Sequence, residues 1–293
     1  MTLPDVRGVL ELLRLPSVLT VPGDSLVGAV WSAEPAKLRR AAPLATASSL
    51  LYLSGMALND YADRQVDARE RPGRPIPSGR VSPRLALAIA SGLTAGGLAV
   101  AFAAGGRRAT AVSGALAAVV WGYDMALKDT PAGPTTMACA RALDVFMGAS
   151  VASPRGALPA AAVTAAHTLT ITVVSRREVP GATRALPRAA LSASAAISAV
   201  AAMLAVRAGQ DARGRIVALA LLGAHTVSMV RAELAATRQP TASSLGRLVG
   251  TGVMAFMPLQ ASLLAARGAH RPALTLAATW PAARALARRV AVT

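Results

Sequence analysis

The chain has 293 residues, of which 54% are hydrophobic and 15% are charged, and its formal net charge is +17. A soluble domain usually carries about 25% charged residues, and a soluble all-α protein of this composition would have to bury almost every helix on all sides. The basic residues stand between apolar runs and only 3% of residues are aromatic, which favours charges flanking membrane spans over a nucleic-acid partner.

Apolar stretches of about 17 to 24 residues recur along the chain, and this length is typical of transmembrane helices. The expected helices are 9–31, 41–62, 83–105, 108–127, 135–152, 157–175, 187–207, 213–236 and 243–266. A tenth stretch, 272–290, is weaker because it contains Pro281, so nine or ten crossings remain open. We predict an all-α, polytopic membrane protein with a single domain over 1–293. His167 and His225 are expected to be buried and bound by neighbouring helices.

Three connections are longer than the others: 63–82, 128–134 and 176–186. If the helices cross the membrane alternately, these loops lie on one side. That side carries more Lys and Arg than the other, so the positive-inside rule predicts that the three loops face the cytoplasm. The predicted location is therefore the cell (inner or plasma) membrane.

The first long loop follows an acidic motif, "NDYADRQVD". Asn59, Asp63 and Asp67 are spaced i, i+4, i+8, and Asp60 lies three residues before Asp63, so these side chains share a helix face. Like charges so placed repel unless a cation lies among them, and oxygen ligands without Cys or His favour Mg²⁺. Mg²⁺ held by carboxylates usually also binds substrate phosphates. The motif predicts a site for a diphosphate on an apolar tail; the alternative is a loop whose charges pair with one another.

These residues resemble a known family, the UbiA superfamily of intramembrane prenyltransferases. "NDYADRQVD" is similar to the family's N-D-x-x-D-x-x-x-D motif, "RPIPSGRVS" to the segment that follows it, and "YDMALKDTPAGP" to the loop after the fourth helix. The chain is most similar to an Ala/Arg-rich actinobacterial subgroup with EboC-like members. The resemblance implies about nine helices around a central cavity that opens sideways to lipid. It also implies that Mg²⁺ joins the diphosphate to two acidic motifs, and that Lys128 and Arg74 hold the diphosphate.

The second motif of the family is depleted here, because residues 175–187 contain one acid, Glu178, flanked by Arg176 and Arg177. We expect the first motif to carry most of the metal binding, with one of these arginines in place of a second cation. Altered or lost catalysis is the alternative. The predicted metal ligands are Asn59, Asp60, Asp63, Asp67 and Glu178.

Ionisable side chains inside the apolar segments are costly and are therefore functional candidates. Asp24 either orients the acceptor or acts as a base, or else it marks a helix break satisfied by Ser25 or another neighbour. Arg141 and Asp144, spaced i, i+3, either form a structural ion pair or place Asp144 in the cavity. Tyr123 either shields a developing allylic cation with its ring face or packs.

The predicted function is Mg²⁺-dependent transfer of an isoprenyl group from an allylic diphosphate to an unidentified small acceptor. The predicted catalytic residues are Asp60, Asp63 and Lys128. The predicted substrate contacts are Asn59, Arg74, Tyr123, Lys128, Arg141, Asp144, Arg177 and Asp24. A terpene cyclase of the same fold is an alternative that the low aromatic content disfavours. A non-catalytic carrier of isoprenoid lipid is another, supported by the depleted second motif.

Overall fold

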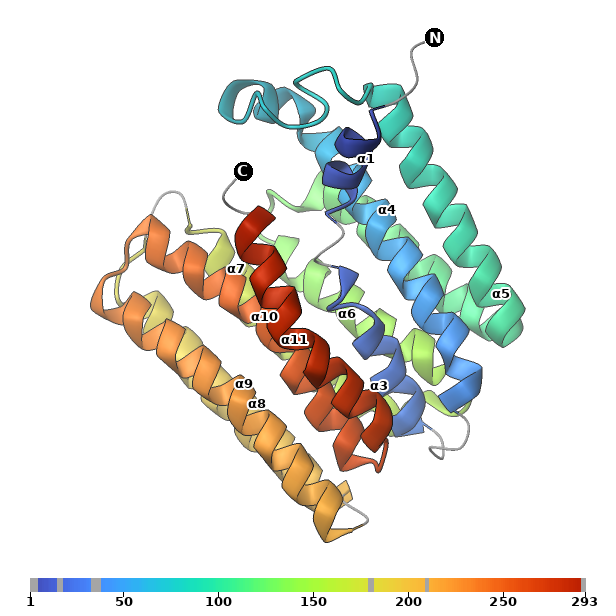
Figure 1. Ribbon diagram of the computed structural model, residues 1–293, viewed down its shortest axis with the longest axis vertical. Coiled ribbons are helices and arrows are strands. Elements are labelled where there is room, and N and C mark those ends of the chain that lie inside the picture. Colours follow the sequence, from blue (N-terminus) through green and yellow to red (C-terminus); the bar gives the residue numbers. More distant parts are fainter. Residues whose placement is uncertain (1–4, 15–17, 33–37, 179–181, 209–210, 291–293) are drawn as a thin grey trace.

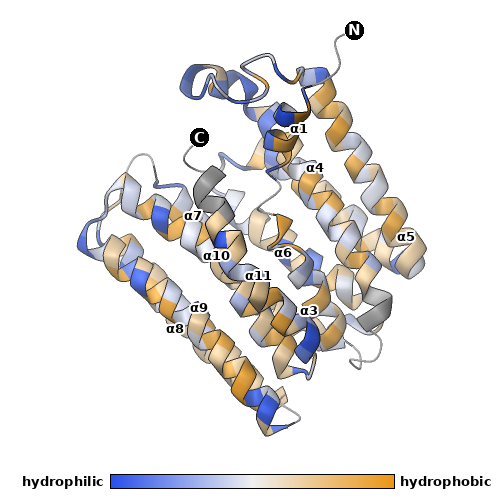
Figure 2. Ribbon diagram, in the orientation of Figure 1, coloured by the Kyte–Doolittle hydropathy of each residue, from blue (hydrophilic) through white to orange (hydrophobic). Residues whose placement is uncertain are grey.

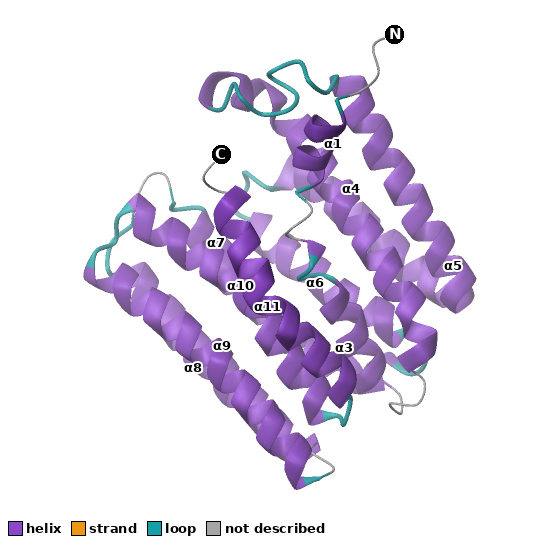
Figure 3. Cartoon of the chain, viewed as in Figure 1, coloured by secondary structure: helices purple, strands orange, loops and turns teal. Residues whose placement is uncertain are grey.

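The computed structural model describes residues 5–14, 18–32, 38–178, 182–208 and 211–290. Within these ranges the chain consists of helices and the loops between them, without a strand (Figure 3). The all-α prediction is therefore confirmed for the part of the chain that the structure describes.

The segment expected as one helix over 9–31 forms two helices, and the prediction of a continuous helix is wrong. Helix α1, Val6–Leu13, ends at Arg14, whose backbone is left-handed at φ 45°. Helix α3, Pro22–Ser32, begins with a proline. Proline suits the first turn of a helix but breaks a helix interior, because it lacks an N–H and its ring clashes with the preceding turn. The break leaves α1 as a short helix of its own.

Helix α4, Leu38–Glu70, is longer than the predicted 41–62. Its 33 residues span about 50 Å at about 1.5 Å per residue, whereas the apolar core of a bilayer is about 30 Å thick. All four predicted metal ligands of the first motif lie on this continuous helix. The helix is therefore longer than the apolar layer is thick, and the acidic motif lies at its C-terminal end.

Helix α5, Pro83–Gly122, contains a sharp reversal at Gly106, whose φ of 61° and ψ of −153° are not helical. Trp121 Nε1 donates a hydrogen bond to Thr94 Oγ1 at 3.1 Å. In a straight helix these residues would stand about 40 Å apart, so the two arms fold back on each other. The expected pair of helices, 83–105 and 108–127, is confirmed as a hairpin, which continues into the π-helix η2, Tyr123–Leu127.

The later helices follow their predicted ranges within a few residues. They are α6 Gly133–Ala149, η3 Pro154–Ala157, α7 Leu158–Ser175, α8 Ala185–Ala208, α9 Ala212–Arg238, α10 Ala242–Ala266 and α11 His270–Val290. Five segments of the described chain are long and apolar enough to cross a membrane. They are Pro83–Leu127, Pro154–Ser175, Ala185–Ala208, Ala212–Arg238 and Ala242–Ala266. The chain is a multi-pass membrane protein, and nine crossings stay a prediction.

Helix α10 has more buried residues than any other described helix, and α3, α7, α8, α9 and α11 pack around it (Figure 1). His167 of α7 and His225 of α9 are fully buried, and their rings lie 3.1 Å and 3.0 Å from the carbonyl oxygens of Gly252 and Ala255 on α10. The expectation for these histidines is confirmed. Figure 2 shows hydrophilic residues gathered at the end of the molecule near α1 and the C-terminal end of α4, and apolar residues along α5, α8 and α9.

The three long connections meet at this same end. Lys128, after η2, forms an ion pair with Asp63 of α4. Arg176, after α7, donates hydrogen bonds to the backbone carbonyls of Asp129 and Thr130. The prediction that the loops share one side is confirmed, since these contacts join all three.

Candidate active site

The buried carboxylates at the end of α4 are held by arginines. Asp60 Oδ1 accepts hydrogen bonds from Arg14 Nη2 at 2.6 Å and from Arg74 Nη1 at 3.2 Å. The same Arg74 nitrogen donates to Asp67 Oδ2 at 2.8 Å. Asp60 and Asp67 are only 4% and 3% exposed. Because a buried carboxylate is costly without a cation, Arg14 and Arg74 stabilise this end of the helix.

A second set of contacts lies between α4 and η2. Asn59 Nδ2 donates to Asp124 Oδ1 at 3.1 Å, and Lys128 pairs with Asp63. The wide turn of η2 is closed by the Lys128 N–H, which donates to the Tyr123 carbonyl at 2.9 Å. A π-turn shifts the side chains that follow it around the helix axis and is frequent at functional sites. Here it presents both Asp124 and Lys128 to α4.

Sequence reasoning missed two members of this cluster, Arg14 and Asp124. Arg14 is far from the motif in sequence and had no local signal beyond its charge. Asp124 had one: it precedes Lys128 by four residues at the polar end of an apolar stretch, a spacing that places both side chains on one face. The predicted members that the structure brings together are Asn59, Asp60, Asp63, Asp67, Arg74 and Lys128.

The depleted second motif adds no acidic side chain to the cluster in the described structure. Glu178 is half-buried, and its charged neighbour is Arg71. Burial raises the pKa of this carboxyl, and Arg71 opposes that rise. Arg177 is exposed, whereas Arg176 makes the loop contacts. The rest of the motif includes residues 179–181, which lie outside the described residues.

The donor atoms of the cluster suit Mg²⁺ in type, since they are carboxylate and amide oxygens along one helix face. Within the described ranges, however, no three His, Cys, Asp or Glu side chains stand close enough to share a metal ion. The oxygens of Asp60, Asp63 and Asp67 are engaged by arginine and lysine instead. A metal ion at this place therefore requires these basic side chains to exchange partners.

A cavity of about 440 Å³ opens next to this cluster. Its walls are mainly apolar and come from α4, α5, α6, α7 and α10, with Leu51, Leu116 and Ile171 among them. Arg14 and Tyr123 line it at the end near the acidic motif. The cavity thus leads from a charged cluster into an apolar interior.

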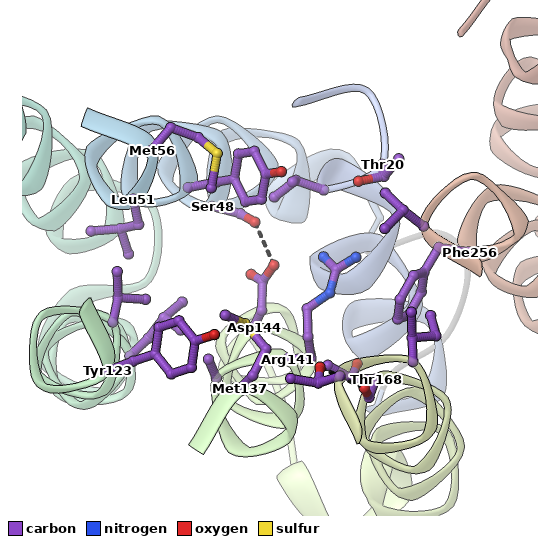
Figure 4. A pocket seen from close by; sticks show the side chains of 18 of the residues that line it. Thr20, Ser48, Leu51, Met56, Tyr123, Met137, Arg141, Asp144, Thr168 and Phe256 are labelled. Carbon is purple, nitrogen blue, oxygen red and sulfur yellow. Dashed lines mark hydrogen bonds between the residues drawn. The ribbon is translucent and has the colours of Figure 1, made fainter. Parts of the chain in front are cut away.

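The other end of the cavity, which we call the polar floor, is formed by Ser48, Arg141 and Asp144 (Figure 4). Ser48 Oγ donates to Asp144 Oδ2 at 2.6 Å. Arg141 Nη1 lies 2.6 Å from Asp24 Oδ2. The expected ion pair between Arg141 and Asp144 is therefore wrong in its partner, because Asp24 of α3 approaches Arg141 and leaves Asp144 facing the cavity.

The carboxylate of Asp24 is bound by neighbouring side chains, which is one of the two interpretations that the sequence allowed. Gln260 Nε2 of α10 donates to Asp24 Oδ1 at 2.8 Å and to the Thr20 carbonyl at 2.9 Å. The Arg141 guanidinium also lies 4.2 Å from the centre of the Phe256 ring, a cation–π distance. These contacts fix Arg141 at the floor of the cavity.

Comparison with known proteins adds a family and a fold. The model of the UbiA prenyltransferase family matches residues 24–236. The chain is 36% identical over 132 residues to digeranylgeranylglyceryl phosphate synthase from Methanopyrus kandleri, a match covering 43% of this chain and 46% of that protein. A match to the enzyme of the same name from Natronomonas pharaonis covers 32% of its length. The chain thus spans a third to a half of the length of these two relatives.

Two solved structures share the fold. A UbiA homolog from Aeropyrum pernix K1 superposes with a TM-score of 0.62 at 22% identity, covering 85% of this chain and 96% of the other. A UbiA homolog from Archaeoglobus fulgidus bound to GPP and Mg²⁺ gives a TM-score of 0.61 at 17% identity, covering 86% and 99%. At these identities the likeness establishes the arrangement of helices.

Proposed function

The chain belongs to the UbiA prenyltransferase family, and we propose on that premise that it transfers an isoprenyl group from an allylic diphosphate to a small acceptor within the membrane. One observation carries this proposal: Arg14, which binds Asp60 of the charged cluster, also lines the apolar cavity. A diphosphate needs cations and metal ligands, and its isoprenyl tail needs an apolar space. The charged cluster supplies the cations and the metal ligands, and the cavity supplies the apolar space.

The diphosphate binds between Lys128, Arg74 and Arg14 in this proposal. Each of these side chains now neutralises a carboxylate. Arriving phosphate oxygens compete for the same N–H donors, because charge-assisted bonds to phosphate are among the strongest that arginine makes. Asn59, Asp60, Asp63 and Asp67, with Asp124 beside them, then become available to hold Mg²⁺. An archaeal homolog with this fold is bound to GPP and Mg²⁺, which agrees with a diphosphate and a metal ion in such a site.

Glu178 has a lesser place in this ligand set than the sequence alone implied. Its charged neighbour is Arg71 rather than one of the first-motif acids. Arg176, which binds the backbone of the loop after η2, holds the loop containing Glu178 next to Lys128. We assign Arg176, which makes these loop contacts, rather than Arg177 to support the diphosphate end of the site.

The proposed reaction begins when the bond between the allylic carbon and the diphosphate oxygen breaks and its electron pair leaves with the diphosphate. Bound Mg²⁺ supplies Lewis-acid stabilisation of that leaving group. Lys128 and Arg74 neutralise the charge that develops on it, and the Tyr123 ring stands at the cavity entrance where the allylic cation forms. The acceptor attacks the allylic carbon and loses its proton, while the apolar walls exclude water.

For the acceptor we propose a chemical class, and for the location we propose a membrane and the side of it that the long loops face. The names of the curated relatives refer to glyceryl phosphate, so we take the acceptor to be small and lipid-like. The proposed location is the cell membrane with the three long loops in the cytoplasm, on the distribution of Lys and Arg. The proposed actinobacterial, EboC-like subgroup rests on the sequence resemblance alone.

A non-catalytic carrier of isoprenoid diphosphates is the second candidate. It is favoured by one observation, that arginine and lysine already occupy the first-motif carboxylates while the second motif holds a single acid. A carrier would bind the diphosphate through the same basic side chains without breaking its bond.

The deciding experiment uses membranes that contain the protein, radiolabelled farnesyl diphosphate and Mg²⁺, with and without a lipid extract as the source of acceptor. Product that depends on the extract supports transfer. Product that forms without it, as hydrocarbon or terpene alcohol, identifies a cyclase. Tight binding with release of unchanged diphosphate identifies a carrier and overturns the proposal. Membranes from cells without the protein are the control.

A further inference from the structure

A second hollow opens between α5 and α6, at the end of these helices that is remote from the acidic motif. We call it the Arg108 groove, and its lining includes Arg108, Val112, Phe146, Ser150 and Ser153. The second arm of α5 starts after the reversal at Gly106 and runs toward η2, whereas α6 runs back from the loop that follows η2. The groove therefore lies between the start of one helix and the end of the other. Along its helix, Arg108 stands about 22 Å from Tyr123, so the groove is separate from the candidate active site.

The groove is polar at its rim and apolar one helical turn further in. Arg108 and Ser150 lie at the ends of their helices. Val112 follows Arg108 by four positions and Phe146 precedes Ser150 by four, so each apolar residue lies on the same face as its polar neighbour. Because the two helices run in opposite directions, both apolar residues lie toward the middle of the membrane. A phospholipid has the same order of groups, with its phosphate at the surface and its acyl chains inside.

The rim holds donors that the described structure leaves available to a ligand. Arg108 is exposed and takes part in no ion pair among the described residues. Ser153 directly precedes η3, but its hydroxyl makes no capping hydrogen bond there. Ser150 Oγ, in contrast, already donates to the Met147 carbonyl at 2.6 Å. A guanidinium and a hydroxyl are donors suited to phosphate oxygens, and the bond from the charged guanidinium is the stronger of the two.

We propose that the Arg108 groove binds an anionic phospholipid, with its phosphate at Arg108 and Ser153 and one acyl chain along Val112 and Phe146. The place of the groove in the fold favours a lipid, because a groove at the end of two neighbouring helices of a multi-pass membrane protein is bordered by lipid. Its charge favours an anionic headgroup, since basic pockets between membrane helices bind such headgroups. The proposal does not depend on the prenyl transfer proposed above.

The headgroup charge decides between the common phospholipids. Phosphatidylglycerol brings one negative charge and no positive one, so its phosphate can pair with the Arg108 guanidinium. Phosphatidylcholine carries the same phosphate together with its own quaternary ammonium group. That cation stays close to its phosphate and is repelled by Arg108 and the adjacent Arg107, which is also exposed. Because a lipid bound to the folded protein alone stabilises it, phosphatidylglycerol is also expected to raise the thermal midpoint.

The test titrates phosphatidylglycerol or phosphatidylcholine into the full chain in detergent and obtains Kd by native mass spectrometry. Wild type is expected to bind phosphatidylglycerol about tenfold more tightly than phosphatidylcholine. Arg108→Gln should raise Kd for phosphatidylglycerol by about tenfold and remove this preference. Its thermal midpoint without added lipid should match wild type, because Arg108 is exposed. Its Kd for farnesyl thiolodiphosphate, a donor analogue that resists ionisation, should not differ from that of wild type.

Arg107→Gln is the matched control, because it makes the same change of charge at the neighbouring exposed residue, which does not line the groove. We expect it to change Kd by less than about twofold. Ala111→Phe fills the groove without changing a charge and should weaken binding of phosphatidylglycerol.

Three results overturn the proposal. Equal losses in Arg107→Gln and Arg108→Gln would show a general attraction to surface charge. Equal affinity of wild type for the two lipids would remove the recognition of charge. Displacement of phosphatidylglycerol by soluble glycerol phosphate at similar concentration would show that the groove binds a free phosphate and not a lipid. Each of these results leaves the proposed prenyl transfer unaffected.

Discussion

Arg14 Nη2 lies 2.6 Å from Asp60 Oδ1 and joins the end of α1 to the acidic motif of α4 across 46 positions of sequence. Arg14 is also the one non-glycine residue with positive φ in the described chain. The left-handed backbone ends α1 at Arg14, and Arg14 also lines the cavity. The Arg14 side chain thus connects the first helix, the acidic motif and the apolar cavity.

Replacing Arg14 is expected to weaken donor binding more than it weakens the fold. In Arg14→Gln the Asp60 carboxylate keeps Arg74, so the protein is expected to remain folded. The diphosphate loses one of its three cations, and we expect Kd for farnesyl thiolodiphosphate to rise by about tenfold or more. Arg7→Gln is the control, because Arg7 is exposed and pairs with Glu11 on the same short helix. Equal losses in both variants would contradict a role for Arg14 at the site.

Replacing Asp63 tests the metal assignment. Asp63→Ala removes a proposed Mg²⁺ ligand and leaves Lys128 free to bind phosphate. We expect turnover to fall by at least about a hundredfold with a small change in thermal midpoint. Glu70→Ala, at the exposed end of the same helix, is expected to retain turnover. Turnover in Asp63→Ala close to wild type would remove Asp63 from the ligand set.

Asp124 is the ligand candidate that the structure adds. Asp124→Asn keeps the size of the side chain and its contact with Asn59 but removes the negative charge. We expect a loss of turnover that higher Mg²⁺ concentrations partly restore, because a ligand charge is missing and the shape is kept. The measurement is the Mg²⁺ dependence of turnover after chelation with EDTA. Asp129→Asn, on the exposed part of the next loop, is the control and should follow the wild-type curve.

Glu178→Gln is expected to reduce turnover less than Asp63→Ala, because the charged neighbour of Glu178 is Arg71 rather than a first-motif acid. The same change is also expected to alter how the stability of the fold depends on pH. Burial raises the pKa of Glu178 above its ordinary 4.5, so the folded protein holds its proton more tightly than the unfolded chain. Stability therefore decreases as pH rises from about 4.5 through the folded pKa. Glutamine stays neutral, so the stability of the variant should fall less than that of wild type over this pH range. Thermal midpoints of both proteins between pH 4 and 7 measure the difference.

The pair of Arg141 and Asp24 is expected to behave as one unit. Asp24 is fully buried, so Arg141→Leu leaves a carboxylate without its cation and is expected to cost about 3 to 5 kcal/mol of unfolding free energy. The double change Asp24→Asn with Arg141→Leu removes both charges and should recover most of that loss. Denaturation in detergent micelles completes the double-mutant cycle. Additive losses would show that the two side chains do not support each other.

Local patterns predicted the features that depend on neighbours in sequence. Helical spacing placed Asn59, Asp63 and Asp67 on one face, since that spacing depends on the helix alone. The alternation of apolar and polar segments placed the three long loops together. The same local reasoning was wrong at 9–31, where the charged and apolar residues before Pro22 did not reveal that Arg14 ends one helix ahead of the next.

By itself, the sequence determined the all-α membrane architecture, the position of the acidic motif and the identity of its basic loop, because length, hydropathy and helical periodicity are properties of contiguous residues. Only the tertiary structure decided the partners: Arg14 for Asp60, Asp124 for Asn59 and Asp24 for Arg141. Each of these pairs joins helices far apart in the chain. Their choice depends on how closely the helices pack and on the high cost of leaving a buried charge without a partner, and neither can be read from spacing along the sequence.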